Sequence, residues 1–227
     1  MPAAPTPTTT PVPSPGHRLH RLLPVLVLLL TVGQLAVAQW VPGIERFEGK
    51  AFGARLLAYP VLMLVVPAVW WLASRRRPAA DRAPAPYAAT TLVMLPFLVD
   101  VTGNSLDLYD AVVWWDDANH LVNWALLCGG LGLLVAPTLP RGWQVVLLVT
   151  GIGAVLAIAW EAGEWLTFIR HGTEVETAYE DTLADEVLGT LGALVAGLVL
   201  AAVWRSRATP GPHGAAVGSA TTTTLER

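Results

Sequence analysis

The stretch GWQVVLLVTGIGAVLAIAWEAGEW, residues 142–165, decides the fold, because it carries no charged side chain before Glu161. A helix needs about 20 apolar residues to cross the roughly 30 Å of hydrocarbon in a bilayer. In lipid the backbone must satisfy its own hydrogen bonds, and this run is too long for a barrel strand. The stretch therefore predicts a transmembrane helix that ends in two acidic residues, Glu161 and Glu164.

The composition of the whole chain also indicates a membrane protein. Of the 227 residues 54% are hydrophobic and only 14% are charged, whereas an ordinary soluble domain has roughly 25% charged residues. We therefore expect the lipid bilayer as the partner and no nucleic acid. The single cysteine, Cys128, excludes an intrachain disulfide and a cysteine-based metal cage.

Several apolar runs have the length of a membrane span, and they predict an all-α, polytopic helical bundle with six transmembrane helices. The expected spans are 22–41, 51–74, 85–101, 118–136, 142–165 and 182–204. The flanking segments 1–21 and 205–227 contain Pro- and Thr-rich tracts with little to bury, so we expect disordered cytoplasmic tails. One alternative stays open, because residues 36–38 (AVA) resemble a signal-peptide cleavage site.

The third span is the weakest of the six, since its strongly apolar part is short and contains Pro96. The distribution of basic residues decides in its favour. With six spans and a cytoplasmic N-terminus, the basic residues on the inner side are Arg18, Arg21, Arg75, Arg76, Arg77, Arg82, Arg141, Arg205, Arg207 and Arg227. Those on the outer side are Arg46, Lys50, Arg55 and Arg170. Without the third span the 14 basic residues would divide equally between the two sides, so we expect six spans with both termini cytoplasmic.

This topology brings polar residues from several spans to one extracytoplasmic level. They are Asp100, Asp116, Asp117, His120, Glu161, Glu164, Asp181 and Asp185, with Arg55 as the cation at that depth. Helical spacing places Asp117 and His120 on one face, and Asp185 above a stripe of small residues that marks a helix contact. We interpret Asp117 and His120 as facing inward, and Asp116 as a solvated charge at the start of its helix.

Acidic side chains with one imidazole are typical ligands of hard or borderline divalent cations. So many carboxylates cannot all remain ionised and unpaired at one partly buried site. A bound cation, raised pKa values or extensive hydration must therefore compensate their mutual repulsion. The candidate ligands for one divalent metal ion are Asp117, His120, Glu161, Glu164, Asp181 and Asp185. Secondary candidates are Arg55, Asp100 and Asn104, and the candidates for a catalytic role are Glu161 and Glu164.

Three segments together resemble a known family. LYDAVVWWDDANHLVNW (108–124), WEAGEW (160–165) and YEDTLADEVLGTLGAL (179–194) are similar, in order and in place on the helices, to the YjdF-like family of uncharacterised bacterial inner-membrane proteins. The resemblance covers roughly residues 90–200. It implies a multi-pass protein of the bacterial cytoplasmic membrane and implies no activity.

Two classes of function and one structural alternative follow from these residues. The acid/histidine mouth is either a metal-assisted active site for a lipid or envelope substrate, or the cation or proton site of a transporter. The third reading is a structural or partner-binding membrane protein. The inner halves of the spans, such as 126–136 and 192–202, are almost wholly apolar, and this favours a site open to the outside over a transport path. Whether the protein is an enzyme stays open.

Overall fold

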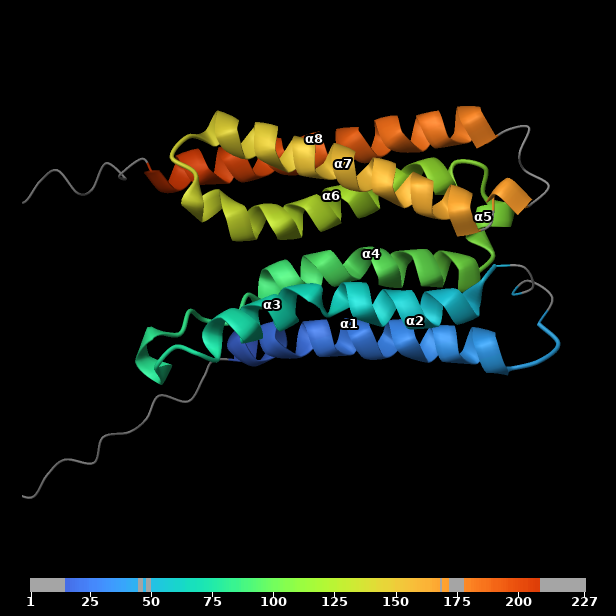
Figure 1. Cartoon of the computed structure of the whole chain (residues 1–227), viewed down its shortest axis with the longest axis horizontal. Helices are drawn as coiled ribbons and strands as arrows, with labels where there is room; N and C mark the ends of the chain where they lie inside the picture. The colour runs from blue at the N-terminus through green and yellow to red at the C-terminus, as the bar shows by residue number, and fades with distance from the viewer. Residues whose placement is uncertain (1–14, 45–46, 48–49, 168, 172–177, 209–227) are drawn as a thin grey trace, which may run out of the picture.

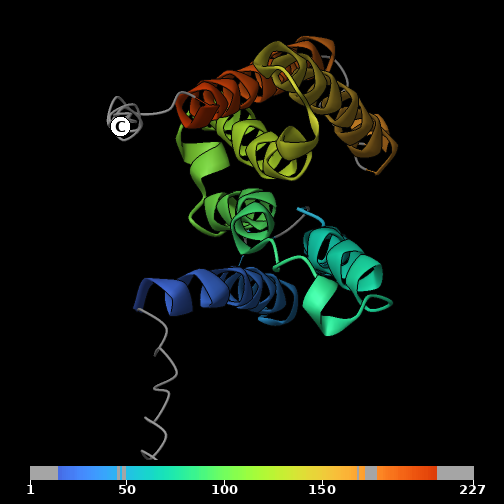
Figure 2. The same ribbon diagram turned by 90° about the vertical axis from the view of Figure 1, so that its left-hand side faces the viewer.

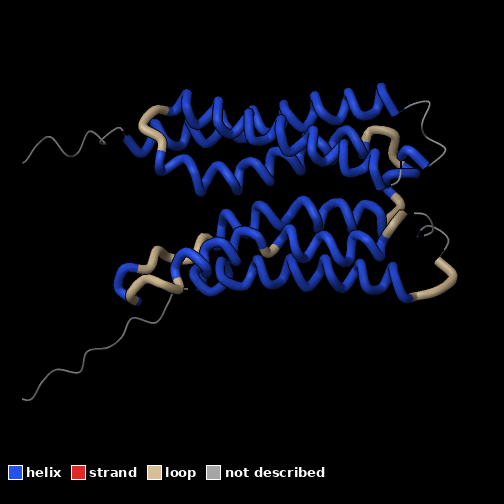
Figure 3. The backbone as a smooth tube through the Cα atoms, viewed as in Figure 1, coloured by secondary structure: helices blue, strands red, loops and turns tan. Residues whose placement is uncertain are grey.

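The computed structural model describes residues 15–44, 47, 50–167, 169–171 and 178–208, and among these it contains helices and no strand (Figure 3). The α-helices are α1 (Pro15–Trp40), α2 (Phe52–Met63), α3 (Val65–Ser74), α4 (Tyr87–Ser105), α5 (Leu108–Ala111), α6 (Trp115–Val135), α7 (Gly142–Thr167) and α8 (Ala178–Ala208). Within the described part of the chain, short 3₁₀ helices also lie at Ala79–Asp81, Ala136–Thr138 and Ile169–His171. The expected all-α bundle is therefore confirmed.

The long helices run side by side along the longest axis of the molecule (Figure 1). We call the end where α1, α4 and α7 end the polar end, and the opposite end the basic end. Helix α1 begins and helix α8 ends at the basic end, so both ends of the described chain lie on one side (Figure 1). Helix α1 begins at Pro15 and α8 extends to Ala208, so both reach into segments expected to be tails, whereas residues 1–14 and 209–227 lie outside the described residues.

The helices form two layers, which are joined where α4 packs against α6 (Figure 2). Helices α1, α2, α3 and α4 form the first layer, and α6, α7 and α8 form the second (Figures 1 and 2). Helices α2 and α3 are two parts of one span, because Pro67 has no N–H to bond the carbonyl of Met63 and the α-helix is interrupted at Leu64. This arrangement puts α4 and α6 at the centre of the molecule.

Each layer has its own apolar core. The first core is centred on Leu35, Met63 and Val101, and the second on Cys128 and Val145, all of which are fully buried. In the second layer small residues allow close packing, since a Cβ at Gly153 would lie only 2.2 Å from that of Ala193. Trp160 of α7 packs against both cores and therefore ties the two layers together.

Among the described residues, five helices rather than the expected six are long and apolar enough to cross a membrane. They are Leu19–Trp40, Phe52–Ser74, Trp115–Thr138, Gly142–Thr167 and Ala178–Val203. Helix α4, the expected third span, is the one that falls outside this set, because it carries Asp100, Asn104 and several threonines in its 19 residues. It packs against α1, α2, α3 and α6, so its polar groups meet protein rather than lipid.

Candidate metal site at the polar end

Asp116, His120 and Asp185, here called the Asp–His–Asp group, meet at the polar end between α6 and α8. Each offers one ligand atom, and these atoms all lie within 4.8 Å of one another. The Nδ1 atom of His120 lies 2.7 Å from Oδ1 of Asp185 and 3.6 Å from Oδ1 of Asp116. Asp185 is buried, with 4% of its surface exposed, so its charge must be compensated locally.

The second nitrogen of His120 faces a third carboxylate. Its Nε2 atom lies 3.8 Å from Oε1 of Glu161 on α7, and the Glu161 residue is only 5% exposed. A neutral imidazole has a single N–H, so its other nitrogen turns a lone pair toward a carboxylate oxygen. That contact is repulsive unless a proton or a cation lies between the two atoms. The 2.7 Å contact from Nδ1 to Asp185 is an ion pair when the imidazole is protonated, although its angles lie outside those of a well-aligned hydrogen bond.

Asp116 takes the place that the sequence interpretation gave to Asp117. Asp117 is exposed, whereas Asp116 is partly buried and lies one helical turn before His120. The Asp116 side chain is 42% exposed, so it keeps contact with solvent as interpreted, but it also faces the imidazole, which the interpretation had assigned to Asp117. Asp116 lies four residues before His120 and Asp117 three, and both spacings bring side chains close together on a helix. Only the position of α8, which carries Asp185, decides that Asp116 is the acid near the imidazole.

The other candidate ligands lie around this group but not in it. Glu164 is partly buried one turn after Glu161 and interacts electrostatically with both His120 and Arg55. Asp181 is exposed and lies one turn before Asp185 on α8. The structure thus brings together three of the six predicted ligands, His120, Glu161 and Asp185, and adds Asp116.

A second polar cluster, here called the Asp100 network, contains all three of the secondary candidates. Both carboxylate oxygens of Asp100 accept hydrogen bonds. Oδ2 accepts from Arg55 Nη1 at 2.8 Å and from the Tyr59 hydroxyl at 2.6 Å. Oδ1 accepts from the Tyr109 hydroxyl at 2.8 Å and from Asn104 Nδ2 at 3.2 Å. Through these hydrogen bonds the Asp100 carboxylate links α2 and α5 to α4.

The Asp100 network continues to the helix that carries His120. Since the Tyr109 hydroxyl donates to Asp100, its oxygen accepts a hydrogen bond from Nδ2 of Asn119. Burial, with the charge of Asp100 beside it, raises the pKa of Tyr109 far above its usual range, so this hydroxyl keeps its proton. Asn119 in turn accepts a hydrogen bond of 2.8 Å from Asn123. The residue next to His120 is therefore held by a directed chain of hydrogen bonds.

An ion pair between Lys50 and Asp110 crosses the loops at this end, at 2.5 Å between Nζ and Oδ2. The hydrogen bond from Lys50 lowers the pKa of Asp110. The sequence reasoning assigned no role to either residue, nor to Tyr59, Asn119 or Asn123. The spacing of Tyr59, four residues after Arg55 on one helical face, is a signal that could have identified it.

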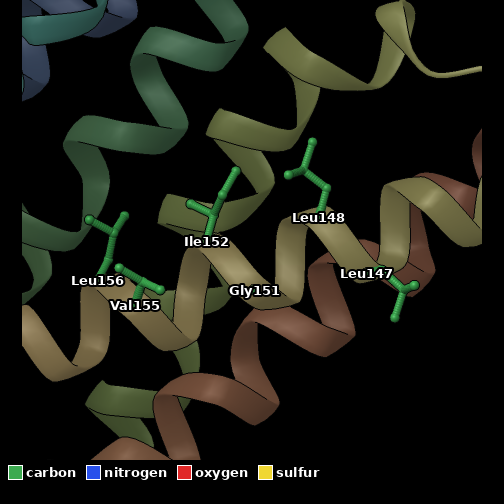
Figure 4. Close-up of a pocket in the computed structure, with 6 residues that line it drawn as sticks. All are labelled: Leu147, Leu148, Gly151, Ile152, Val155 and Leu156. Atoms are coloured by element: carbon green, nitrogen blue, oxygen red, sulfur yellow. The ribbon is translucent and has the colours of Figure 1, made fainter.

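Apolar side chains close the site on the side of the basic end. A Cβ at Gly189, one turn after Asp185, would lie 2.8 Å from the ring of Trp124, so this ring fills the space between α6 and α8. Cys128 and Ala157 follow, and they are 0% and 1% exposed. Farther along α7, an apolar hollow of about 480 Å³ is lined by residues between Leu147 and Leu156, none of them charged (Figure 4).

Comparison with family models places these helices in one family. The chain belongs to DUF2238, a family of predicted membrane proteins. The match spans residues 24–207 and so includes both the Asp–His–Asp group and the Asp100 network. It is consistent with the expected YjdF-like family of uncharacterised membrane proteins. Neither a search of curated proteins nor a search of solved structures gave a match.

Proposed function

We propose that this membrane protein binds one divalent cation at its polar end, through Asp116, His120 and Asp185. The observation that carries the proposal is the convergence of one carboxylate from each of two helices on the same imidazole nitrogen, with all three ligand atoms within 4.8 Å of one another. Nitrogen and oxygen ligands from facing helices are the usual way to build a metal site in a helical bundle.

The surrounding charges support a cation rather than an empty polar pocket. Glu161 is buried and adds a third carboxylate within 3.8 Å of the same imidazole. Several carboxylates at one buried point repel each other strongly unless positive charge is supplied. One imidazole with carboxylate oxygens suits borderline or hard ions such as Zn²⁺, Fe²⁺ or Mn²⁺. Glu161 lies at Nε2, the nitrogen opposite the one assigned to the metal, where it would accept the Nε2–H hydrogen bond and so orient the imidazole.

We further propose that the site opens to the extracytoplasmic side and acts on a lipid or envelope substrate. The basic residues Arg75, Arg76 and Arg77 follow α3 at the opposite end, as expected of the cytoplasmic side. When bound, a divalent cation would supply a Lewis acid for a phosphoryl or carbonyl oxygen. Glu164, partly buried and within electrostatic range of His120 and Arg55, would accept a proton, and the planar guanidinium of Arg55 suits an anionic oxygen.

The apolar side chains on the inner side of the site favour binding at one end of the bundle over transport through it. A transport path needs polar groups or water near the middle of the membrane. Directly below the site the described side chains are instead Trp124, Cys128 and Ala157, in a packed apolar cluster. We therefore place the cation-transporter alternative second.

Paired substitutions on one helix test the metal site. Asp116→Asn removes a proposed ligand, and Asp117→Asn changes the exposed neighbour by the same chemistry. We expect purified wild-type protein to carry one divalent ion in elemental analysis. The affinity should fall by more than roughly tenfold in Asp116→Asn and stay unchanged in Asp117→Asn. Because the two variants differ by one position, a general loss of acidic charge cannot produce this contrast.

A second pair separates loss of metal from loss of folding. His120→Ala removes the imidazole, and Asp181→Asn changes an exposed acid on α8. We expect both variants to insert and to elute as the wild type does in size-exclusion chromatography, with metal lost only from His120→Ala. Wild-type protein that is folded and binds no divalent ion would refute the proposed function, as would equal metal content in Asp116→Asn and the wild type.

A further inference from the structure

A second hollow lies at the basic end, far along the helices from the Asp–His–Asp group. It is an open hollow of about 560 Å³ at the surface of the bundle. Three parts of the chain line it, namely the start of α1 with His20 and Arg21, the segment from Pro84 into α4, and the end of α6 with Leu133 and Leu134. The hollow therefore lies where the first layer of helices meets the second.

The charge at this end favours an anionic ligand. Arg21 is exposed and has no hydrogen bond or ion pair with any described residue. Arg75, Arg76, Arg77, Arg82 and Arg141 lie at the same end, and within the described part of the chain the acid there is Asp81 alone. Unbalanced positive charge at a membrane surface attracts anionic head groups by about 1 kcal/mol per basic residue, or roughly fivefold in affinity.

The other walls of the hollow favour a ligand with hydrocarbon chains. Leu133 and Leu134 are 39% and 38% exposed and belong to a helix that is apolar enough to cross the membrane. Tyr87 is half-buried at the rim, a position that suits a ring with one apolar and one polar side. Free phosphate would use the basic residues but gain nothing from the leucines, whereas a phospholipid uses both.

The wall formed by the segment from Pro84 into α4 has a stiff backbone. Pro84 and Pro86 each fix one backbone dihedral, and the segment leads directly into α4 at Tyr87. A wall that is already ordered loses little conformational entropy when a ligand binds. This wall is therefore ordered before a ligand arrives.

We propose that the basic-end hollow binds one anionic phospholipid of the adjacent leaflet. The phosphate lies at Arg21 and His20, and the acyl chains lie along Leu133 and Leu134. Basic pockets between membrane helices on the cytoplasmic side bind anionic head groups in the same way. A lipid held there contacts α1, α4 and α6 at once and so joins the two layers at the end opposite to the Asp100 network.

Lipid retention measured by native mass spectrometry tests this proposal. The full chain is purified from nanodiscs that contain equal amounts of phosphatidylglycerol and phosphatidylcholine. We expect one phosphatidylglycerol to remain bound and Arg21→Gln to weaken its binding about fivefold. Arg141→Gln removes an arginine at the same end that does not line the hollow, and we expect it to leave binding unchanged. Leu134→Ser should weaken retention while keeping all charges.

Three results would overturn the proposal. Equal weakening in Arg21→Gln and Arg141→Gln would mean that the whole surface attracts lipid without a specific site. Equal retention of phosphatidylcholine would remove the role of charge. Displacement of the lipid by soluble glycerol phosphate at matched concentration would mean that the leucines play no part. Asp116→Asn should leave lipid retention unchanged, so this test stands apart from the test of metal binding.

Discussion

Replacement of Gly192 by alanine links the packing of α6 and α8 to the metal site. A Cβ at Gly192 would lie 2.3 Å from the carbonyl oxygen of Leu121 and 2.9 Å from the amide nitrogen of Ala125, both backbone atoms of α6. Ordinary contact begins at 3.4 Å, so the added methyl group needs about 1 Å of extra separation. Backbone atoms cannot rotate away as a side chain does, so the two helices must move apart.

This movement predicts a loss of both stability and metal affinity. Overpacking of this kind costs about 1–3 kcal/mol. Leu121 is adjacent to His120, and Gly192 lies two turns after Asp185, so separation of the helices also lengthens the 2.7 Å contact between these two ligands. Metal–ligand distances tolerate only about 0.2 Å. We therefore expect the affinity for a divalent ion to fall at least roughly tenfold in Gly192→Ala.

Gly151→Ala is the matched control, because a Cβ at Gly151 on α7 would have no atom within 4 Å. We expect this variant to be neutral or slightly more stable than the wild type, since alanine favours a helix over glycine. Thermal unfolding in detergent measures stability, and isothermal titration with Mn²⁺ or Zn²⁺ measures affinity. Equal behaviour of the two variants would refute the proposed link between helix packing and the metal site, as would a Gly192→Ala variant that loses stability but binds the metal as tightly as the wild type.

Three further results are expected. Tyr109→Phe leaves Asp100 without one of its donors and should lower stability by about 1–3 kcal/mol, whereas Tyr179→Phe, at a residue 78% exposed, should leave the unfolding temperature unchanged. Chelation of the metal should lower the unfolding temperature, because a bound ion stabilises only the folded protein. The affinity for the metal should fall as pH is lowered, because the ligands must lose protons to bind it. An unfolding temperature that is the same with and without the chelator would contradict this expectation. The hydrogen bond from Lys50 lowers the pKa of Asp110, so the contribution of this pair to stability is present above the unfolded pKa of Asp110 and is lost as pH falls through its folded pKa. Since Asp110 is exposed, Lys50→Met should remove less than about 1 kcal/mol of this acid dependence, as measured by unfolding at each pH.

The apolar runs were sufficient to predict most of the fold, because a helix in lipid must satisfy its own backbone regardless of its neighbours. Helix α4 is the exception. Its hydropathy is lowered by residues such as Asp100 and Asn104, whose partners Arg55, Tyr59 and Tyr109 come from other elements. A hydropathy pattern treats every residue as if it faced lipid, so it cannot tell a central helix with satisfied polar groups from a poor span.

The sequence predicted the end of the bundle at which the candidate site lies, but not all of the residues that form it. Topology alone placed His120, Glu161 and Asp185 at one end, and the structure brings them together. The choice of Asp116 over Asp117 was not available from the sequence, because both residues lie within a turn of His120. The hydrogen bonds from Asp100 through Tyr109 to Asn119 join three consecutive helices, and their geometry depends on how the two short connections between these helices fold.

The amino-acid sequence by itself determined that this protein is a bundle of membrane helices with most of its acids at one end and most of its arginines at the other. Those properties are set by the order of apolar and charged segments along the chain. Only the tertiary structure decided which acids face the imidazole of His120, because that depends on the rotation of α6 against α8. Close contacts at Gly189 and Gly192 fix this rotation, and they exist only when the two helices are packed.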